Sequence, residues 1–236
     1  MPKESLKSDK HEKPDTRRGH RERLRARFIK GGGDALHEYE LLELILFRAI
    51  PRRDVKPIAK ELLDKFKDLS AVLSASRQDL TKTNFITDSV VTEFKIIEAS
   101  ALRLGQSKIM HREILGNWDA IIAYCRTKLA ENKVEELHVL FLDKKNRIIA
   151  DEAMAIGTVD HTPFYPREII KRALELNASG LILVHNHPSG DPQPSKADIK
   201  STIKLRELAQ GFNIFLHDHI IIGRHSEVSF KNDRII

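Results

Sequence analysis

Four residues in the C-terminal half have the types and spacing to hold a metal ion. His185 and His187 lie two residues apart at the end of the apolar run LILV, and Ser195 and Asp198 follow a loop rich in proline and glycine. Side chains two residues apart in a strand point to the same side, so both imidazoles would face one site. Two imidazoles and one carboxylate, with a fourth position open for water, are typical of catalytic zinc sites, so we expect zinc here.

The same residues also have a purely structural interpretation. Ser195 and Asp198 have the spacing of a capping box at the start of a helix, and a histidine at a strand end often serves only as a hydrogen-bonding loop residue. The joint spacing favours the metal site, because four apt residues coincide on one strand, loop and helix. Both interpretations are compatible, since a capped helix start would hold Ser195 and Asp198 in place.

The surrounding pattern predicts the elements that must position these residues. Residues 179–187 have the composition of a buried strand, and 195–212 have helical periodicity. The other predicted strands are 136–143, 147–159, 213–223 and 227–230, and the other predicted helices are 117–132 and 166–178. This order predicts an α/β domain, a mixed sheet flanked by helices, spanning 114–236.

The N-terminal half has a different pattern. Short helical segments separated by glycine and proline follow one another up to Gly105, which predicts a small all-α domain over 17–105. Residues 1–16 lack apolar periodicity and are expected to form a disordered basic tail. Residues 106–119 are the expected junction.

The motifs of the C-terminal half resemble a known family. The four residues His185, His187, Ser195 and Asp198 match the JAMM (MPN+) signature, and HNHPSGDPQPSKAD, with YPREIIKRAL before it and LHDHIIIG after it, is similar to the RadC family, UPF0758. The resemblance implies a JAB/MPN fold, which is cytidine-deaminase-like. It also implies zinc bound by both histidines and the aspartate, a serine that helps to stabilise the oxyanion, and hydrolysis of peptide or isopeptide bonds in a peptide or protein substrate.

The resemblance further implies a glutamate on an earlier strand that activates water. Glu135 and Glu136 are the candidates, and as neighbours they face opposite sides of a strand. We favour Glu135, because it shares parity with the apolar residues of the following strand and lies where RadC-like chains carry their acid. The alternative is a solvated acid at the strand start. Glu152 and Glu168 are lesser candidates.

Two further features contain residue types that can bind metal ions. His217, Asp218 and His219 could support zinc-bound histidines from behind, or could be polar residues at a strand edge. Cys125, the single cysteine, lies on an amphipathic helix and is expected in the core.

Composition excludes several classes of protein. One cysteine cannot form an internal disulfide, and no apolar run approaches the roughly 18 residues of a membrane span, so we expect a cytoplasmic protein with no membrane partner. The net charge is +6, and residues 1–30, with eleven basic and five acidic residues, carry all of it. The predicted zinc domain is therefore not generally attracted to polyanions.

A second hypothesis makes the protein a DNA-associated repair or recombination accessory, with the MPN domain as a metal-stabilised interaction module. The resemblance marks the helical half as RuvA-domain-2-like, with a helix-hairpin-helix motif. The corresponding LTKTNFITDSVV has no glycine where many relatives have Gly-Ile-Gly, so phosphate contact through this turn is weakened. A solvated helix is the alternative to non-specific DNA binding by the basic segment, whose candidate residues are Arg17, Arg18, Arg21 and Arg25.

Overall fold

The computed structural model describes residues 16–157 and 165–236, with the side chains of 16–18 left out. The chain divides into two compact units, Met1–Phe94 and Lys95–Ile236, which we call the helical unit and the sheet unit. Of the tail expected over 1–16, only Thr16 is described, and it begins the first helix. No helix in the described part of the chain has the length and apolarity needed to cross a membrane.

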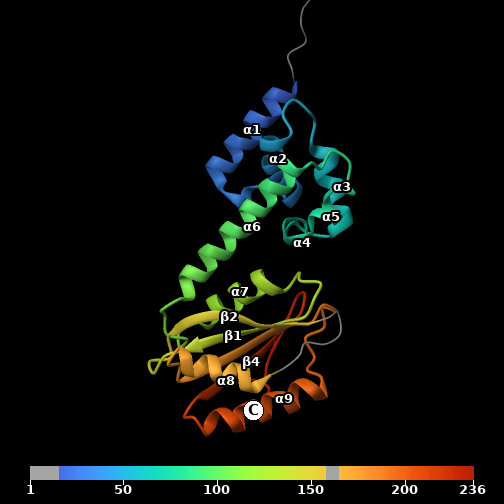
Figure 1. Ribbon diagram of the computed structural model, residues 1–236. Coiled ribbons are helices and arrows are strands. Elements are labelled where there is room, and N and C mark those ends of the chain that lie inside the picture. The colour runs from blue at the N-terminus through green and yellow to red at the C-terminus, as the bar shows by residue number, and fades with distance from the viewer. Residues whose placement is uncertain (1–15, 158–164) are drawn as a thin grey trace, which may run out of the picture. The chain divides into compact units, whose positions relative to one another are not determined.

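The helical unit is built from short helices around one apolar core, which confirms the expected all-α region. Its elements are α1 (Thr16–Gly31), η1 (Gly33–Ala35), α2 (Glu38–Ala49), α3 (Lys56–Phe66), α4 (Leu69–Ser74), α5 (Arg77–Leu80) and the start of α6 (Asp88–Ile109) (Figure 1). Leu42, Leu46, Leu62 and Phe94 are buried together in this core. Asp68 and Ser76 begin α4 and α5 as N-caps, each accepting a backbone N–H three residues on.

The turn before α6 adopts a conformation that normally favours glycine. Phe85 has φ of 66°, in the left-handed region, and its ring is 53% exposed. The Arg53 guanidinium lies 3.8 Å from the centre of that ring and stacks on it. The chain therefore forms the hairpin turn without glycine, at the expense of backbone strain.

The sheet unit confirms the predicted mixed α/β architecture. Its strands are β1 (Glu136–Leu142), β2 (Ile148–Ile156), β3 (Gly180–Asn186), β4 (Phe215–Ile222) and β5 (Glu227–Ser229), in the order β2-β1-β3-β4-β5. Among the strand pairs of the described residues, only β3–β4 is parallel. The helices of this unit are the end of α6, α7 (Trp118–Leu129), α8 (Pro166–Glu175) and α9 (Lys196–Gln210).

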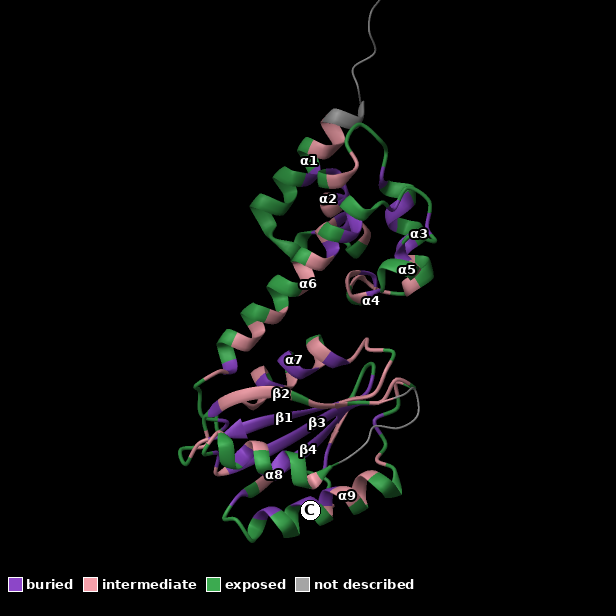
Figure 2. Cartoon of the chain, in the orientation of Figure 1, coloured by how far each residue is buried: buried purple, intermediate pink, exposed green. Residues whose placement is uncertain are grey.

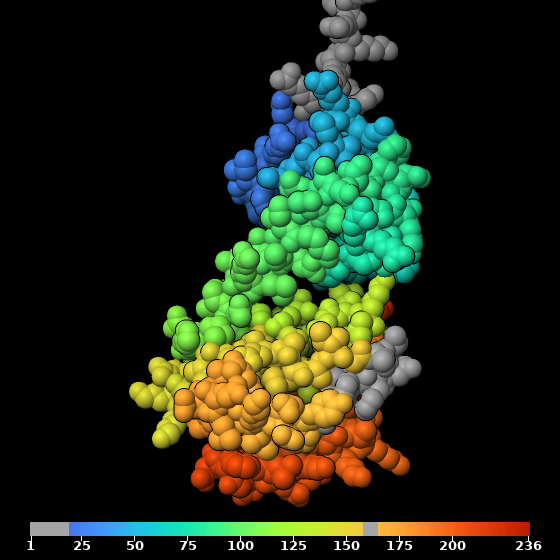
Figure 3. Space-filling view, in the orientation of Figure 1, coloured from blue at the N-terminus to red at the C-terminus, as the bar shows by residue number. Residues whose placement is uncertain are grey.

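Alternation along the strands sends side chains to two separate apolar layers. Figure 2 shows the central strands coloured as buried. Leu140 and Leu142 of β1 pack with α7 on one face, whereas Leu137 and Val139 pack with α8 and α9 on the other. Figure 3 shows α8 and α9 side by side at the surface of this unit, where they cover the second layer. The sheet is therefore enclosed by helices on both faces.

The same alternation determines on which face of the sheet the side chain of His185, near the end of β3, lies. Leu181 and Leu183 belong to the layer under α8 and α9, and His185 shares their parity. His185 therefore lies on the face of the sheet that α8 and α9 cover.

The parallel pairing of β3 and β4 brings the start of α9 to the end of β3. A parallel connection must return along the sheet, and α9 supplies the crossover. The loop between β3 and α9 is held against the turn after β4, because the Gly190 carbonyl accepts the Arg224 N–H at 3.1 Å and the His187 N–H donates to the Ile222 carbonyl at 3.0 Å.

The structure corrects one helix boundary. Gly105 was expected to end the last helix of the N-terminal half, but α6 continues to Ile109. A Cβ on Gly105 would lie 3.1 Å from the Tyr124 ring of α7, so this glycine permits close packing and does not act as a stop signal. The division between the two units falls inside α6. The predicted strand 147–159 ends at Ile156, and residues 158 and 159 lie outside the described part.

We predict that Gly223→Ala destabilises the sheet unit by about 1–3 kcal/mol. A Cβ at this position would lie 2.5 Å from the Gly190 carbonyl oxygen and 2.8 Å from Pro192 Cδ, and backbone cannot move aside cheaply. Urea unfolding would measure the loss. Gly211→Ala is the control, because its Cβ would meet nothing closer than 3.4 Å, and its stability should change by less than about 0.5 kcal/mol. Equal stability of the two variants would contradict this packing argument.

Candidate metal centre

The structure brings together the three predicted metal ligands. His185 is the penultimate residue of β3, His187 directly follows the strand, and Asp198 lies in the first turn of α9. The two Nε2 atoms are 3.0 Å apart, and the Asp198 oxygens lie 3.7 Å from Nε2 of His185 and 3.6 Å from Nε2 of His187. Within residues 16–157 and 165–236, this is the one cluster of three such side chains close enough to share a metal ion.

One ligand atom from each of the three side chains lies within 4.8 Å of the others, so the three can share one metal ion. Zinc with nitrogen and oxygen ligands at about 2.0–2.2 Å places its ligand atoms about 3.3–3.6 Å from one another. Here the two Nε2 atoms are 3.0 Å apart, and each has one Asp198 oxygen nearby, Oδ1 at 3.7 Å from His185 and Oδ2 at 3.6 Å from His187. Two imidazoles and a carboxylate are a donor set that zinc accepts. The residues present therefore fit the metal that the donor set implies.

The capping box predicted at the start of α9 is present and orients one of the ligands. Ser195 Oγ accepts the Asp198 N–H at 3.1 Å, and the Ser195 N–H donates to Asp198 Oδ2 at 2.7 Å. The second bond fixes the rotation of the Asp198 carboxylate. Capping and metal binding are thus compatible at this helix terminus.

The surroundings shift the pKa values of the three ligands in different directions. Burial lowers the pKa of His185 to about 4, so its imidazole is neutral at neutral pH. Burial opposes ionisation of Asp198, but contacts with His187 and Ser195 outweigh it and hold the pKa of that carboxyl well below its usual range. Burial also lowers the pKa of His187, yet Asp198, the Asp191 carbonyl and the charge of Glu135 together raise it.

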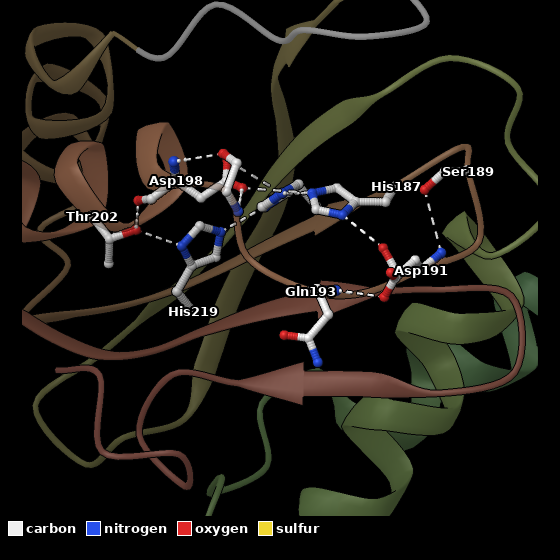
Figure 4. A network of polar contacts seen from close by, with 9 residues as sticks. His187, Ser189, Asp191, Gln193, Asp198, Thr202 and His219 are labelled. Carbon is white, nitrogen blue, oxygen red and sulfur yellow. Dashed lines mark hydrogen bonds and ion pairs between the residues drawn. The ribbon is translucent and has the colours of Figure 1, made fainter.

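Each imidazole has a partner behind it (Figure 4). Nδ1 of His187 donates to the Asp191 carbonyl at 2.8 Å, because a carbonyl can only accept. Nδ1 of His185 lies 2.7 Å from Nε2 of His219 on β4, and Nδ1 of His219 lies 2.6 Å from the Thr202 hydroxyl on α9. Sequence reasoning left His219 undecided and missed Thr202.

The two candidate glutamates lie on different sides of the sheet. Glu136 Oε2 is 3.3 Å from Nε2 of His138, whose parity places it in the α7 layer. Glu135, directly before β1, has the parity of Leu137, which pairs with His185 on the α8–α9 face. The influence of Glu135 on the pKa of His187 agrees with this placement. Only Glu135 is thus on the side of the metal cluster.

Asn186, between the two histidines, ties the Glu135 segment to β3. Its side chain is 1% exposed. Oδ1 accepts the Glu136 N–H at 2.9 Å, and Nδ2 donates to the carbonyls of Val134 at 3.1 Å and Asn132 at 3.3 Å. One amide thereby holds the backbone on both sides of Glu135 at the end of the strand that carries His185.

Comparison with known proteins assigns the family. Residues 115–235 match the family model described as RadC-like JAB domain. A UPF0758 protein of Ruegeria pomeroyi is 53% identical over 218 residues, covering 92% of this chain and 97% of that protein. Another, from Rhodobacter capsulatus, is 53% identical over 213 residues, covering 90% of this chain and all of that protein. The chain belongs to the RadC-like JAB family.

The remaining candidate residues of this RadC-like chain lie away from the cluster or stabilise the fold. The Arg172 guanidinium of α8 binds both oxygens of Glu152, each at 2.7 Å, and Glu168 lies exposed beside Arg167. His217 packs at Gly180, at the other end of β3, Asp218 accepts the Ser229 hydroxyl, and Cys125 is buried in α7. Of the cluster 217–219, only His219 contacts a predicted ligand.

The basic residues of α1 differ in their surroundings. Arg21 donates to the carbonyls of Phe47, Ile50 and Arg53 and lies over the Phe47 ring, so its guanidinium is used inside the helical unit. Arg25 is exposed, and the side chains of Arg17 and Arg18 lie outside the described residues. Arg21 therefore fits a structural role better than the DNA contact expected of it.

We predict that Asn186→Ala destabilises the sheet unit by about 1–3 kcal/mol, because it leaves half-buried backbone groups of residues 132–136 without their side-chain partner. The amide hydrogen of Glu136 should also exchange faster with solvent, as hydrogen-exchange mass spectrometry would detect. Asn132→Ala is the control, since Asn132 is bound through its main-chain carbonyl. Unchanged exchange at Glu136 in the Asn186 variant would contradict the role given to this amide.

Proposed function

We propose that this protein is a zinc-dependent hydrolase of peptide or isopeptide bonds. The observation that carries the proposal is the convergence of His185, His187 and Asp198 at one end of the sheet, with Glu135 on the same face. Membership of the RadC-like JAB family supports a metal-dependent hydrolase fold. The peptide or isopeptide substrate follows from the resemblance of the motif to JAMM proteases.

The exposure of the ligands supports a catalytic site over a closed structural one. The His185 side chain is 3% exposed, whereas those of His187 and Asp198 are 16% and 17% exposed. The cluster is therefore closed behind His185 and accessible on the side of the other two ligands. A catalytic zinc site keeps such an open position, and a structural zinc site fills it with a fourth protein ligand. Bound there, zinc would acidify a water molecule and polarise an amide carbonyl.

Glu135 is the group proposed to carry the proton. Its position directly before β1, with the parity of Leu137, and its effect on the pKa of His187 support a carboxylate on the metal side. A carboxylate there can take a proton from the attacking water and return it to the leaving amine, as general acid–base catalysis requires. The Asn186 amide limits movement of this segment, so the carboxylate needs little reorganisation.

Ser195 is proposed to stabilise developing negative charge. In the capping box its oxygen accepts a bond from Asp198, which uses a lone pair and leaves the hydroxyl hydrogen for another acceptor. The residue is exposed beside the half-buried Asp198. Because the helix terminus already holds this hydroxyl in position, little rearrangement is needed when an oxyanion forms.

The decisive test compares the two adjacent glutamates. Zinc-loaded full-length protein would be screened against peptides and isopeptide-linked substrates, and Glu135→Gln should reduce the rate by about 10²–10⁴-fold while the zinc content stays unchanged. Glu136→Gln is the matched control and should keep most of the activity, because Glu136 contacts His138 on the α7 face.

His187→Ala should lose both zinc and activity, since it removes a metal ligand. Equal loss of activity in the two glutamate variants would contradict the role of Glu135. Zinc binding by the unaltered protein without turnover of any substrate in the screen would favour the alternative, a metal-stabilised interaction module.

A further inference from the structure

We propose that His219 and Thr202 form a buried hydrogen-bond relay that keeps the proton of His185 on Nδ1, leaving Nε2 unprotonated for the metal. His219 and Thr202 are thus positioning residues, not ligands. The proposal rests on the metal-binding part of the proposed function and is independent of whether the site turns over a substrate.

The relay links three elements through short contacts. The Thr202 hydroxyl on α9 lies 2.6 Å from the Asp198 main-chain carbonyl and 2.6 Å from Nδ1 of His219 on β4. Nε2 of His219 lies 2.7 Å from Nδ1 of His185 on β3. Thr202, His219 and His185 are 0%, 1% and 3% exposed, so water does not compete for these bonds. Figure 4 shows His219 with Thr202 and Asp198 beside it.

The direction of the first bond follows from proton counting. A hydroxyl has one hydrogen, and a carbonyl oxygen has none. At 2.6 Å the contact between Thr202 Oγ1 and the Asp198 carbonyl needs a hydrogen between them, which only Thr202 can supply. The Thr202 oxygen must therefore accept from His219, so Nδ1 of His219 carries a proton.

The second bond then fixes His185. Burial of a charged imidazole without a carboxylate partner is costly, and the His219 ring lies against Phe230 with 4.6 Å between ring centres, so His219 is neutral. With Nδ1 protonated, its Nε2 has only a lone pair and must accept. The donor at 2.7 Å is then Nδ1–H of His185. Nε2 of His185 is left unprotonated and lies among the atoms of His187 and Asp198.

The relay also connects two ligands that come from different elements. It starts at the main chain of Asp198 and ends at the ring of His185, so α9 and β3 are joined behind the metal cluster. His187, by contrast, is oriented by the Asp191 carbonyl within its own loop. Loss of the Thr202 hydroxyl would free Nδ1 of His219, which could then carry its proton on Nε2. That proton would point at Nδ1 of His185 and drive the His185 proton to Nε2, where it opposes metal binding.

Zinc affinity of the full-length protein, measured by competition with a chelator, tests the relay. Thr202→Val should weaken zinc binding by about 10–100-fold, as loss of groups behind a metal ligand typically does. Thr202→Ser retains the hydroxyl and should bind within about threefold of the unaltered protein. Ser201→Ala removes the hydroxyl of the adjacent residue and should leave the affinity unchanged. An affinity unchanged by Thr202→Val, or lowered equally by Ser201→Ala, would overturn the proposal.

Nitrogen-15 NMR of the metal-free protein gives a readout that a folding defect would not imitate. The His185 signals should show a protonated Nδ1 and an unprotonated Nε2 in the unaltered chain, and the protonated Nε2 form should appear in Thr202→Val. A His185 ring protonated on Nε2 in the unaltered chain would overturn the relay even if zinc binds. Failure of the unaltered protein to bind zinc, with the expected His185 signals present, would instead contradict the proposed function.

Discussion

A parallel pair of strands in one sheet must be joined by a crossover, and in this protein that requirement assembles the site. β3 and β4 are the one parallel pair in the described sheet, and α9 is their crossover. Its first turn, with Ser195 and Asp198, is therefore returned to the end of β3, where His185 and His187 lie. Without this connection a strand and a helix start, eight residues or more apart in sequence, would have no reason to meet.

Several buried hydrogen bonds around the site have two effects. They pair polar groups in the packed interior, and they orient residues that are proposed to take part in the chemistry. Asn186 satisfies three main-chain groups and, by doing so, places Glu135. Thr202 and His219 are hydrogen-bonded to each other, and His219 is bonded to Nδ1 of His185, which leaves the lone pair of His185 Nε2 directed toward the metal cluster. In a closely packed interior such groups must be paired, because an unpaired buried donor or acceptor costs about 1–3 kcal/mol. Because these buried groups must stay paired, the ligands are held in position before a metal ion binds.

Much of the site could be predicted from the sequence, because the metal ligands and Ser195 lie close together along the chain. The spacing of the histidines, Ser195 and Asp198 identified the cluster, and strand alternation favoured Glu135 over Glu136. The sequence could not predict which residues of separate strands and helices come into contact in the folded sheet unit. Thr202 is an ordinary polar residue of a helix until β4 brings His219 beside it. Gly105 was misjudged for the same reason, since its use depends on the Tyr124 ring of another helix.

The central claim, that two imidazoles and one carboxylate converge on a metal at the end of β3, is tested most directly by X-ray absorption at the zinc edge of zinc-loaded protein. The account predicts four-coordinate zinc with two imidazole nitrogens and two oxygen ligands at about 2.0–2.2 Å, one oxygen from Asp198 and one from water. A sulfur ligand at about 2.3 Å, or a shell containing no imidazole, would contradict it.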